Sequence, residues 1–527
     1  MSIIPTLPRY PIEGVVYPNT ENAARYQQAG AWHTLTAGNA LRAAALRAPD
    51  KCALVCDGLR VTFSEFDSAS EKLAAALLDL GLNPGDRALF QMGSVIETAI
   101  ALLACAKAGI VPVCTLPQHR AIEITTLAER SEARAYFVQG DFGSFDLVRF
   151  ATEMAASCAI PHLIVARTQK PSASTFLSFE KLIQSQSIEQ ARTRLAGIDV
   201  SIADVLMFQL SGGTTNVPKI IPRFHGEFLG VSRAKMNRSM MDTDLVALYS
   251  LPLIHTAGLI SMLYHSILLA GTLVLMQRMD AKEFFTLIER ERVTHSISMG
   301  PAARQMLEYD GIRNHDRSSL RLLTNFDGSE AMERHIGVTC MNIYGIGEGL
   351  LLSPEPTSPK EIRYETVGWP LNSLDEIRLL EPGTERDVTP GELGELCFRG
   401  PNMLPGYFRM PDLNRTIYTS DGYFRTGDIL AMQPFGERAC YSFRGRIRDN
   451  ISRGGEKFGA EEVETVIGRH PDVLDVKVVA MPDRTYGEKA CAFLIKAPGA
   501  RPLTVKTLAD FLLNRSEEHT SELQSQR

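Results

Sequence analysis

Short apolar runs alternate with longer segments of helical periodicity between about residues 34 and 338. Residues 68–80 illustrate the helical segments, because three leucines fall on one stripe and Gly81 follows at the usual C-cap position. Parallel strands need a long crossover connection, usually a helix, so this alternation predicts an α/β domain with largely parallel sheets. The longest apolar stretch, residues 257–276, is interrupted by polar residues and predicts a buried helix followed by a strand.

The pattern changes near Glu361. From there to Met432, short runs such as residues 395–398 lie between Pro and Gly turns, which predicts a small β-rich subdomain. A shorter α/β segment follows a boundary near Asp449. We therefore expect a large N-terminal domain of stacked α/β sheets (residues 1–448), which includes the β-rich subdomain. A small C-terminal α/β lid domain (residues 449–514), truncated in this chain, is expected to follow it.

The last residues of the chain differ from the rest in composition and pattern. Residues 515–526 are polar and carry no periodic apolar face, as in a disordered tail. They also resemble a translated sequencing adapter fused to a truncated reading frame. We favour the second interpretation, because residues 503–514 form a well-patterned helix that stops in mid-course. Residues 515–527 are therefore set aside as a probable non-native tail.

Composition narrows the function classes. The 527 residues are 45% hydrophobic and 22% charged, with a net charge of -6, so no basic stripe for nucleic acid is expected. No apolar run approaches the length of a membrane span, and the N-terminus lacks the charged start and apolar block of a signal peptide. The nine scattered cysteines form no metal-type spacing and favour free thiols in a reducing cytoplasm.

The strongest chemical signal is the loop from Gln209 to Lys219, which follows an apolar strand-like run. Its glycines allow backbone N–H groups to approach phosphate oxygens, its hydroxyls add donors, and Lys219 adds a positive charge. The loop does not end in the Gly-Lys-Ser/Thr of a Walker motif. By itself it could equally be a Gly/Thr-rich surface hairpin. The candidate phosphate ligands are Ser211, Gly212, Gly213, Thr214, Thr215 and Lys219.

Three further motifs follow in order. Residues 344–349 place an aromatic ring and the carboxylate of Glu348 in a Gly-rich turn, which suits a purine and Mg²⁺. Residues 423–428 end in Asp428, a carboxylate suited to ribose hydroxyls. Residues 445–457 combine cations with paired glycines. Taken singly, these segments would be read as a turn, a capped hairpin and a solvated basic loop, but their fixed order after the phosphate loop favours the chemical interpretation.

Together the four segments are similar to the core motifs of the acyl-adenylate-forming superfamily, over about residues 32–514. Within it, residues 116–124, 219–223 and 450–457 resemble the stand-alone 2,3-dihydroxybenzoate and salicylate AMP ligases that feed siderophore assembly lines. The resemblance implies an enzyme that uses ATP and Mg²⁺ to convert a carboxylic acid into an acyl-adenylate and pyrophosphate. The acyl group would then pass to a thiol.

The resemblance also implies a role for each matching residue. Ser211 to Lys219 would wrap the ATP phosphates, and Glu348 would assist Mg²⁺. Adenine would be framed by Asp327, Gly328, Ile343 and Tyr344, and the ribose would be held by Asp428 and Arg446. The acid pocket would contain His255, Thr256, Ser261 and Gly347, with His255 beside the substrate carboxylate. Asp449 would be the hinge, and Gly455 and Lys457 would face the pantetheine thiol. Of these, His255, Lys219 and Glu348 are the candidate catalytic residues.

Several positions depart from the family pattern. Thr256 stands where the aryl-acid ligases have an Asn that contacts the ring hydroxyl, and it would offer a donor on a shorter arm. Phe326-Asp327-Gly328 replaces a Gly-Gly-Ala stretch, Gly347 replaces a small Ala or Thr, and Asn216 replaces a loop glycine. The acid therefore need not be dihydroxybenzoate. The family's near-C-terminal lysine has no counterpart after Asn514.

The chain contains neither a G-x-S-x-G nucleophile elbow nor a carrier-protein serine motif. The acceptor is therefore expected to be a separate phosphopantetheine carrier protein or coenzyme A, with no nucleic-acid or membrane partner and a cytoplasmic location. Two alternatives remain at this point. One is an acyl-CoA ligase that uses the same adenylation chemistry, and the other is a non-catalytic nucleotide-binding fragment that lacks the C-terminal lysine.

Overall fold

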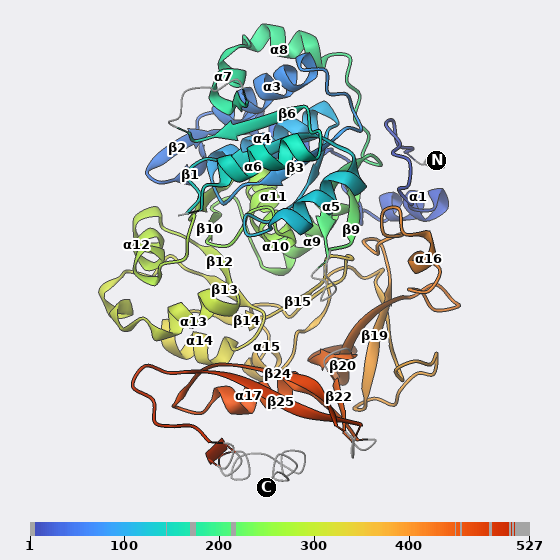
Figure 1. Ribbon diagram of the computed structural model, residues 1–527, viewed down its shortest axis with the longest axis vertical. Coiled ribbons are helices and arrows are strands. Elements are labelled where there is room, and N and C mark those ends of the chain that lie inside the picture. Colours follow the sequence, from blue (N-terminus) through green and yellow to red (C-terminus); the bar gives the residue numbers. More distant parts are fainter. Residues whose placement is uncertain are drawn as a thin grey trace. The chain divides into compact units, whose positions relative to one another are not determined.

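The computed structural model describes residues 6–143, 145–168, 175–211, 218–447, 450–453, 456–483, 487–504, 507–508 and 511. The chain forms two compact units. The large unit comprises Met1–Asp375 and Gly400–Ile417, and the small unit comprises Glu376–Arg399 and Tyr418–Arg527. Figure 1 labels their helices and strands in chain order.

Two seven-stranded sheets form the framework of the large unit, and both follow the same plan. In each sheet neighbouring strands run parallel except at one edge, where an antiparallel partner closes the sheet. The first sheet has the order β7 (Leu177–Ser178), β6 (His162–Ala166), β5 (Ala133–Gln139), β3 (Arg87–Gln91), β4 (Val111–Val113), β8 (Val205–Leu210) and β9 (Ile220–Phe224). The second has the order β14 (Cys340–Asn342), β13 (Leu322–Asn325), β12 (His295–Ser298), β10 (Val246–Tyr249), β11 (Thr272–Leu275), β1 (Cys52–Cys56) and β2 (Leu59–Thr62). The predicted α/β class with largely parallel sheets is confirmed.

Helices cover both faces of both sheets. One apolar core joins the inner faces of the two sheets to a middle layer of helices: α2 (Ala37–Arg47), α3 (Phe63–Asp79), α4 (Ile96–Ala108), α9 (His225–Arg238) and α11 (Tyr264–Leu269). The outer face of the first sheet packs against α5 (Ala121–Ser131) and α6 (Leu147–Ser157). The outer face of the second packs against α12 (Ala281–Glu291), α13 (Gly300–Glu308) and α14 (Ser329–Ile336). Because α4 lies in the middle layer, it is apolar on nearly every side.

Local sequence explains where individual elements begin. Helix α3 starts earlier than its apolar stripe predicts, because Thr62 and Glu65 form a capping box at its N-terminus. The stretch 257–276 becomes α10 (Thr256–Gly258), a π-helical segment η1 (Leu259–Leu263), α11 and β11, in agreement with the predicted buried helix and strand. Shorter elements complete the large unit: α1 (Thr20–Gln28), α7 (Phe179–Gln184), α8 (Ile188–Leu195), η2 (Asp310–Asn314), β15 (Tyr344–Gly345), β16 (Leu351–Ser353), α15 (Lys360–Glu365), β17 (Trp369–Pro370) and α16 (Pro411–Asn414).

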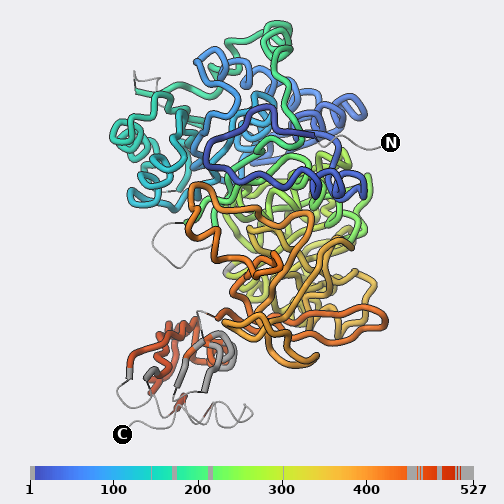
Figure 2. The backbone as a smooth tube through the Cα atoms, turned by 90° about the vertical axis from the view of Figure 1, so that its right-hand side faces the viewer, coloured from blue at the N-terminus to red at the C-terminus, as the bar shows by residue number. Residues whose placement is uncertain are grey.

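An irregular segment, residues 400–417, returns to the large unit after the chain has entered the small one; we call it the strap. Figure 2 shows the strap in orange beside the dark blue N-terminal segment, and the Arg409 N–H donates to the Gly14 carbonyl at 3.1 Å. The Trp32 indole N–H donates to the Pro401 carbonyl at 2.8 Å. The strap is thereby fixed on the surface of the large unit.

The small unit contains two four-stranded sheets. The first is antiparallel, in the order β18 (Glu376–Leu380), β19 (Leu393–Arg399), β20 (Phe424–Phe435) and β21 (Arg438–Arg446). The second has the order β23 (Glu456–Gly459), β22 (Asn450–Arg453), β25 (Gly487–Lys496) and β24 (Val473–Asp483), with α17 (Ala460–Gly468) packed against it. The predicted hinge at Asp449, the tail from residue 515 and most of the predicted helix 503–514 lie outside the described residues.

Candidate active site

The predicted phosphate loop connects the last two strands of the first sheet. Strand β8 ends at Leu210, which pairs with Ile220 at the start of β9, so the loop projects from the carboxyl end of β8. Its base is closed by Ser211, whose N–H donates to the Lys219 carbonyl at 3.0 Å while its hydroxyl accepts from the Lys219 N–H at 3.1 Å. The predicted ligands Gly212, Gly213, Thr214 and Thr215 lie outside the described residues.

One strap residue, Tyr407, brings two candidate catalytic residues together. The Tyr407 hydroxyl donates to Glu348 Oε1 at 2.7 Å. The Lys219 ammonium nitrogen lies 4.6 Å from the centroid of the same tyrosine ring, a cation–π distance. The lysine of the phosphate loop and the candidate Mg²⁺ carboxylate therefore meet at opposite parts of one buried side chain.

The turn that carries Glu348 is held from several sides. The Leu404 N–H donates to the Glu348 carbonyl at 2.8 Å, and the Arg223 guanidinium donates to the Gly347 carbonyl at 3.1 Å. Gly349 has φ +125°, and a Cβ there would lie 1.6 Å from the Asn402 carbonyl oxygen. Only glycine fits this position, because both the backbone angle and the contact exclude a side chain. The Gly-rich sequence around Glu348 is thus required by the close approach of the strap.

The candidate adenine residues follow two neighbouring parallel strands. Strands β13 and β14 pair in parallel with Asn325 opposite Asn342, so Asp327-Gly328 and Ile343-Tyr344 emerge at the same edge of the second sheet. Asp327 is exposed and its carboxylate accepts from the Gly328 N–H at 2.6 Å, whereas Ile343 and Tyr344 are buried. Ligands of open α/β sheets bind outside the carboxyl ends of the strands, and this edge is such a position.

The candidate acid-pocket residues are linked to the phosphate loop by a buried amide. Gln209, at the end of β8, donates through Nε2 to the Ile254 carbonyl at 3.3 Å. A carbonyl accepts only from the NH₂ side of an amide, so Oε1 of Gln209 is the atom that accepts from the Thr256 hydroxyl at 3.0 Å. The hydrogen of Thr256 is therefore already used within the protein. The role of Thr256 toward a substrate stays a prediction.

His255 caps the short helix α10. Its Nδ1 accepts from the Ala257 N–H at 3.3 Å, which places the proton of the neutral ring on Nε2. The residue is exposed to solvent yet closely surrounded by protein, and this desolvation lowers the pKa of its imidazole below the usual value. Ser261 is buried in η1, and Gly347 lies against β9, where a Cβ would come within 3.0 Å of Ile221 Cδ1. His255 and Thr256 are thus tied to β8 through Gln209, and Gly347 to β9.

The candidate ribose residues belong to the small unit. Asp428 and Arg446 stand directly opposite each other on β20 and β21, and the Arg446 Nε lies 3.1 Å from Asp428 Oδ1. Asp428 is buried and its N–H donates to the Thr426 hydroxyl at 3.0 Å. Strand register alone brings this pair together. Of the candidate thiol residues, Gly455 lies outside the described residues, and for Lys457 only its place on β23 is described.

In the described parts of the chain, no three or more His, Cys, Asp or Glu side chains are grouped so as to hold a metal ion by themselves. All nine cysteines are free thiols, as predicted. Among the described residues, no helix combines the length and apolarity that a membrane span requires.

The fold is that of an α/β protein in which the candidate phosphate loop follows the carboxyl end of β8. The sequence matches the family described as AMP-binding enzyme over residues 41–408, and the AMP-binding enzyme C-terminal domain over residues 462–522. The chain therefore belongs to the AMP-binding enzyme family and is an acid–AMP ligase by class, as its motifs predicted. The C-terminal match extends into residues 515–522, part of the segment interpreted as a tail.

Known relatives cover nearly the whole chain. The chain is 35% identical to pyochelin synthase PchD of Pseudomonas aeruginosa over 490 residues, 92% of this chain and 87% of that protein. It is 33% identical to the 2,3-dihydroxybenzoate-AMP ligase of Bacillus subtilis over 498 residues, 92% of this chain and 89% of the relative. The apo structure of Mycobacterium smegmatis MbtA has a TM-score of 0.76 at 30% identity, covering 96% of this chain and 94% of that one.

Sequence reasoning missed three residues of the site. Tyr407 is 59 positions away from Glu348 in the chain, so no local pattern connects them. Gln209 was recognised as the start of the phosphate loop but not as the partner of Thr256. Arg223 was noticed only as part of the likeness to aryl-acid ligases. Its position four residues before Glu227 on the chain was the signal that an ion pair could form.

Proposed function

We propose that this chain activates an aromatic carboxylic acid with ATP, giving acyl-AMP and pyrophosphate, and then transfers the acyl group to a phosphopantetheine thiol of a carrier protein. The setting would be siderophore or related nonribosomal peptide assembly. The observation that carries the proposal is the likeness to a 2,3-dihydroxybenzoate-AMP ligase across nine-tenths of the chain, together with Lys219 and Glu348 meeting at Tyr407.

ATP binding is assigned to the residues of the sequence motifs. Ser211, Gly212, Gly213, Thr214, Thr215 and Lys219 bind the phosphates. Asp327, Gly328, Ile343 and Tyr344 frame adenine, and Asp428 and Arg446 hold the ribose. Asp449 acts as the hinge for the second half-reaction, in which Gly455 and Lys457 face the thiol.

The residues fit Mg²⁺. This ion is usually held by one or two carboxylates together with substrate phosphates and water, rather than by a cage of protein ligands. Glu348 supplies one half-buried carboxylate in a fixed turn beside the phosphate-loop lysine. When bound there, Mg²⁺ would neutralise charge on the triphosphate.

The chemistry requires positioning and charge neutralisation rather than a general base, because a carboxylic acid is already ionised at neutral pH. Lys219 stabilises the charge of the phosphates during in-line attack by the substrate carboxylate. His255 stays neutral because desolvation lowers the pKa of its imidazole, and its Nε2–H is the donor that it offers to the substrate carboxylate.

Thr256 adds a preference for the ring substituent. Its hydroxyl donates to Gln209, and we assign its oxygen as an acceptor toward the ring substituent of the acid. An aromatic acid that carries a donor on the ring, a hydroxyl or an amino group, satisfies this acceptor, whereas an unsubstituted ring leaves it unpaired. Loss of such a hydrogen bond costs about 0.5–1.5 kcal/mol, so salicylate should exceed benzoate by about threefold to tenfold in kcat/KM.

A pyrophosphate-exchange panel tests the substrate class. Hydroxybenzoates and aminobenzoates should support exchange, benzoate less so, and aliphatic acids and amino acids hardly at all. The matched variants Thr256→Ser and Thr256→Val separate the hydroxyl from the side-chain shape: Ser should keep the preference for a ring donor and Val should abolish it. Turnover restricted to aliphatic or amino acids would refute the proposal.

Two site variants test the assignment of ATP. Lys219→Ala and Glu348→Gln should each slow adenylate formation by about 10²–10³, or roughly 3–4 kcal/mol, with little change in the melting temperature. Asp428→Ala should raise the KM for ATP. Unchanged ATP kinetics in all three variants would show that the nucleotide is misplaced. Product analysis with a holo carrier protein and with coenzyme A then identifies the acceptor; a strong preference for coenzyme A would replace the carrier assignment.

A further inference from the structure

Glu348 is a flexible carboxylate that needs an external partner to hold one orientation. A glutamate side chain loses much of its rotamer freedom when it is ordered. The backbone of its turn is fixed by the strap through the Leu404 N–H and by Arg223 through the Gly347 carbonyl. The side chain itself is fixed by the Tyr407 hydroxyl, which donates to Oε1 at 2.7 Å.

Tyr407 is itself held rigidly. Its side chain is buried, and one amide satisfies both of its backbone groups. The Tyr407 N–H donates to Asn414 Oδ1 at 2.8 Å, and Asn414 Nδ2 donates to the Tyr407 carbonyl at 2.9 Å. The next residue, Phe408, bonds to the Ile220 carbonyl at 3.0 Å and places its ring 4.7 Å from that of Phe208. The hydroxyl is therefore anchored to the same hairpin that carries the phosphate loop.

From this geometry we infer that Tyr407 is a positioning residue that sets how Glu348 presents its carboxylate to Mg²⁺. The inference rests on the proposed function. Glu348 would hold Mg²⁺ through its carboxylate, and the bond from the Tyr407 hydroxyl to Oε1 limits the orientations that this carboxylate can adopt. Outer partners of this kind typically change metal affinity by about 10–100-fold when they are removed.

The same ring also positions Lys219. The ammonium nitrogen lies 4.6 Å from the ring centroid, so one side chain orders the metal carboxylate through its hydroxyl and the phosphate lysine through its face. These two effects are separable by mutation. Tyr407→Phe removes the hydroxyl and keeps the ring, whereas Tyr407→Leu removes both.

The test is a Mg²⁺ titration of the binding of α,β-methylene-ATP to the full chain, followed by calorimetry. Tyr407→Phe should raise the Mg²⁺ concentration at half-saturation by about 10–100-fold and leave binding of the analogue without metal unchanged. Tyr407→Leu should weaken both. Tyr309→Phe is the matched control, because it removes a hydroxyl that bonds to His315 at 2.9 Å away from the strap, and it should behave as the wild type. Asn414→Ala should shift the Mg²⁺ midpoint in the same direction by a smaller factor.

A Glu348→Gln background separates this inference from the proposed function. If Tyr407 acts through Glu348, Tyr407→Phe has no further effect on Mg²⁺ in the Glu348→Gln protein. A normal Mg²⁺ midpoint in both Tyr407→Phe and Asn414→Ala, with a weakened one in Glu348→Gln, would overturn the inference and leave the proposed function standing. A normal midpoint in Glu348→Gln would overturn the metal role of Glu348, and with it the role of Tyr407.

Discussion

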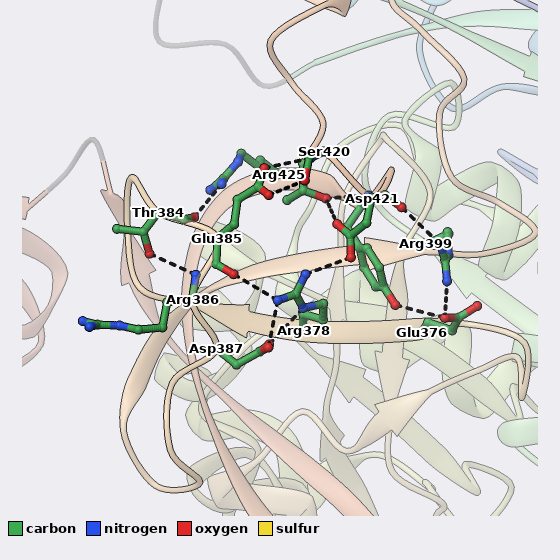
Figure 3. A network of polar contacts seen from close by, with 12 residues as sticks. Glu376, Arg378, Thr384, Glu385, Arg386, Asp387, Arg399, Ser420, Asp421 and Arg425 are labelled. Atoms are coloured by element: carbon green, nitrogen blue, oxygen red, sulfur yellow. Dashed lines mark hydrogen bonds and ion pairs between the residues drawn. The ribbon is translucent and has the colours of Figure 1, made fainter.

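Two ion pairs, one in each unit of this protein, lie in opposite environments. In the large unit, Arg223 and Glu227 form an ion pair at 2.8 Å with side chains only 2% and 5% exposed. In the small unit, charged residues on β18, β19 and the adjoining turns form a solvent-exposed network of polar contacts, shown in Figure 3. Its Arg386–Glu381 pair, at 2.6 Å, has side chains that are 75% and 42% exposed.

Ion pairs with similar N–O distances can therefore contribute very different free energies to stability. Exposed pairs interact through water, and most contribute about 0–1 kcal/mol. A buried pair has lost its hydration, so each charge depends on the other, and removal of one partner is costly. Arg223 also donates to the Gly347 carbonyl beside Glu348, so the buried pair supports the candidate active site directly. Burial, rather than the number of ion pairs, decides where a substitution is damaging.

The largest effect is expected at the buried pair. Arg223→Met leaves Glu227 buried without its partner and should lower the free energy of unfolding by about 3–5 kcal/mol, measured by urea denaturation. Burial already raises the pKa of Glu227 to about 7 despite the opposing guanidinium, so this carboxylate depends on Arg223 for what stabilisation it has. The double variant Arg223→Met/Glu227→Leu is the control and should recover most of the loss. A loss below about 1 kcal/mol in the single variant would contradict the argument from burial.

An intermediate loss of stability is expected where the polar network of the small unit includes a buried carboxylate. Arg425 donates to the buried Glu395 at 2.6 Å and to the Thr384 carbonyl at 2.6 Å. Arg425→Met should destabilise by about 1–3 kcal/mol, the cost of a buried acceptor left unsatisfied. Hydrogen exchange of the β19 and β20 amides reports the change within this unit. Arg425→Met/Glu395→Gln should restore part of the protection, and identical exchange in wild type and Arg425→Met would refute the expectation.

A smaller effect is expected from a buried base without an ion pair. His265 is fully buried, and its ring nitrogens have no hydrogen-bond partner of ordinary geometry, although the Ser232 and Ser261 carbonyls lie near them. Burial lowers the pKa of His265 to about 3, and the nearby Lys235 acts in the same direction. In the unfolded chain the pKa is about 6.5, so below that pH the unfolded state binds more protons and the folded state loses stability.

The comparison is made with His265→Leu, which removes the imidazole and leaves Lys235 and His295 in place. Between pH 6.5 and 5.5 the wild type should lose about 1 kcal/mol more than the variant, measured by urea denaturation at each pH. Above pH 7 the two profiles should run in parallel. Parallel profiles throughout the acid range would show that His265 is protonated in the folded protein.

The sequence predicted those parts of the molecule that depend on local order. The alternation of apolar runs and helical stripes identified the parallel sheets, because burial of both faces of each strand requires such runs. Motif order predicted a phosphate loop and the candidate site residues Glu348, Asp428 and Arg446, and the last two face each other across adjacent strands. These features repeat a short-range pattern that can be recognised without knowing what packs against it.

The sequence could not predict contacts made between distant segments. The strap reaches back across the large unit so that Tyr407 meets Glu348 and Lys219, and no periodicity specifies that approach. The bond from the Thr256 hydroxyl, at the start of α10, to Gln209 on β8 is a second contact of this kind. Only the packed fold shows whether a hydroxyl is free to donate or already used.

The smallest loss of stability is expected at the exposed edge of the polar network. Arg386 donates to Glu381 at 2.6 Å, but both side chains are largely in water, where removal of one leaves the other hydrated. The local turn does not need the guanidinium, because the Arg386 N–H donates to the Thr384 hydroxyl at 3.1 Å and the Glu381 N–H donates to the Arg386 carbonyl at 2.9 Å. Arg386→Ala should therefore change the free energy of unfolding by less than about 0.5 kcal/mol, and added salt should remove even that difference. Urea denaturation of Arg386→Ala beside Arg223→Met, at low and high salt, gives the sharpest contrast. A loss of stability in Arg386→Ala comparable to that in Arg223→Met would mean that the polar network acts cooperatively. Exposure alone would then not set the energy of its ion pairs.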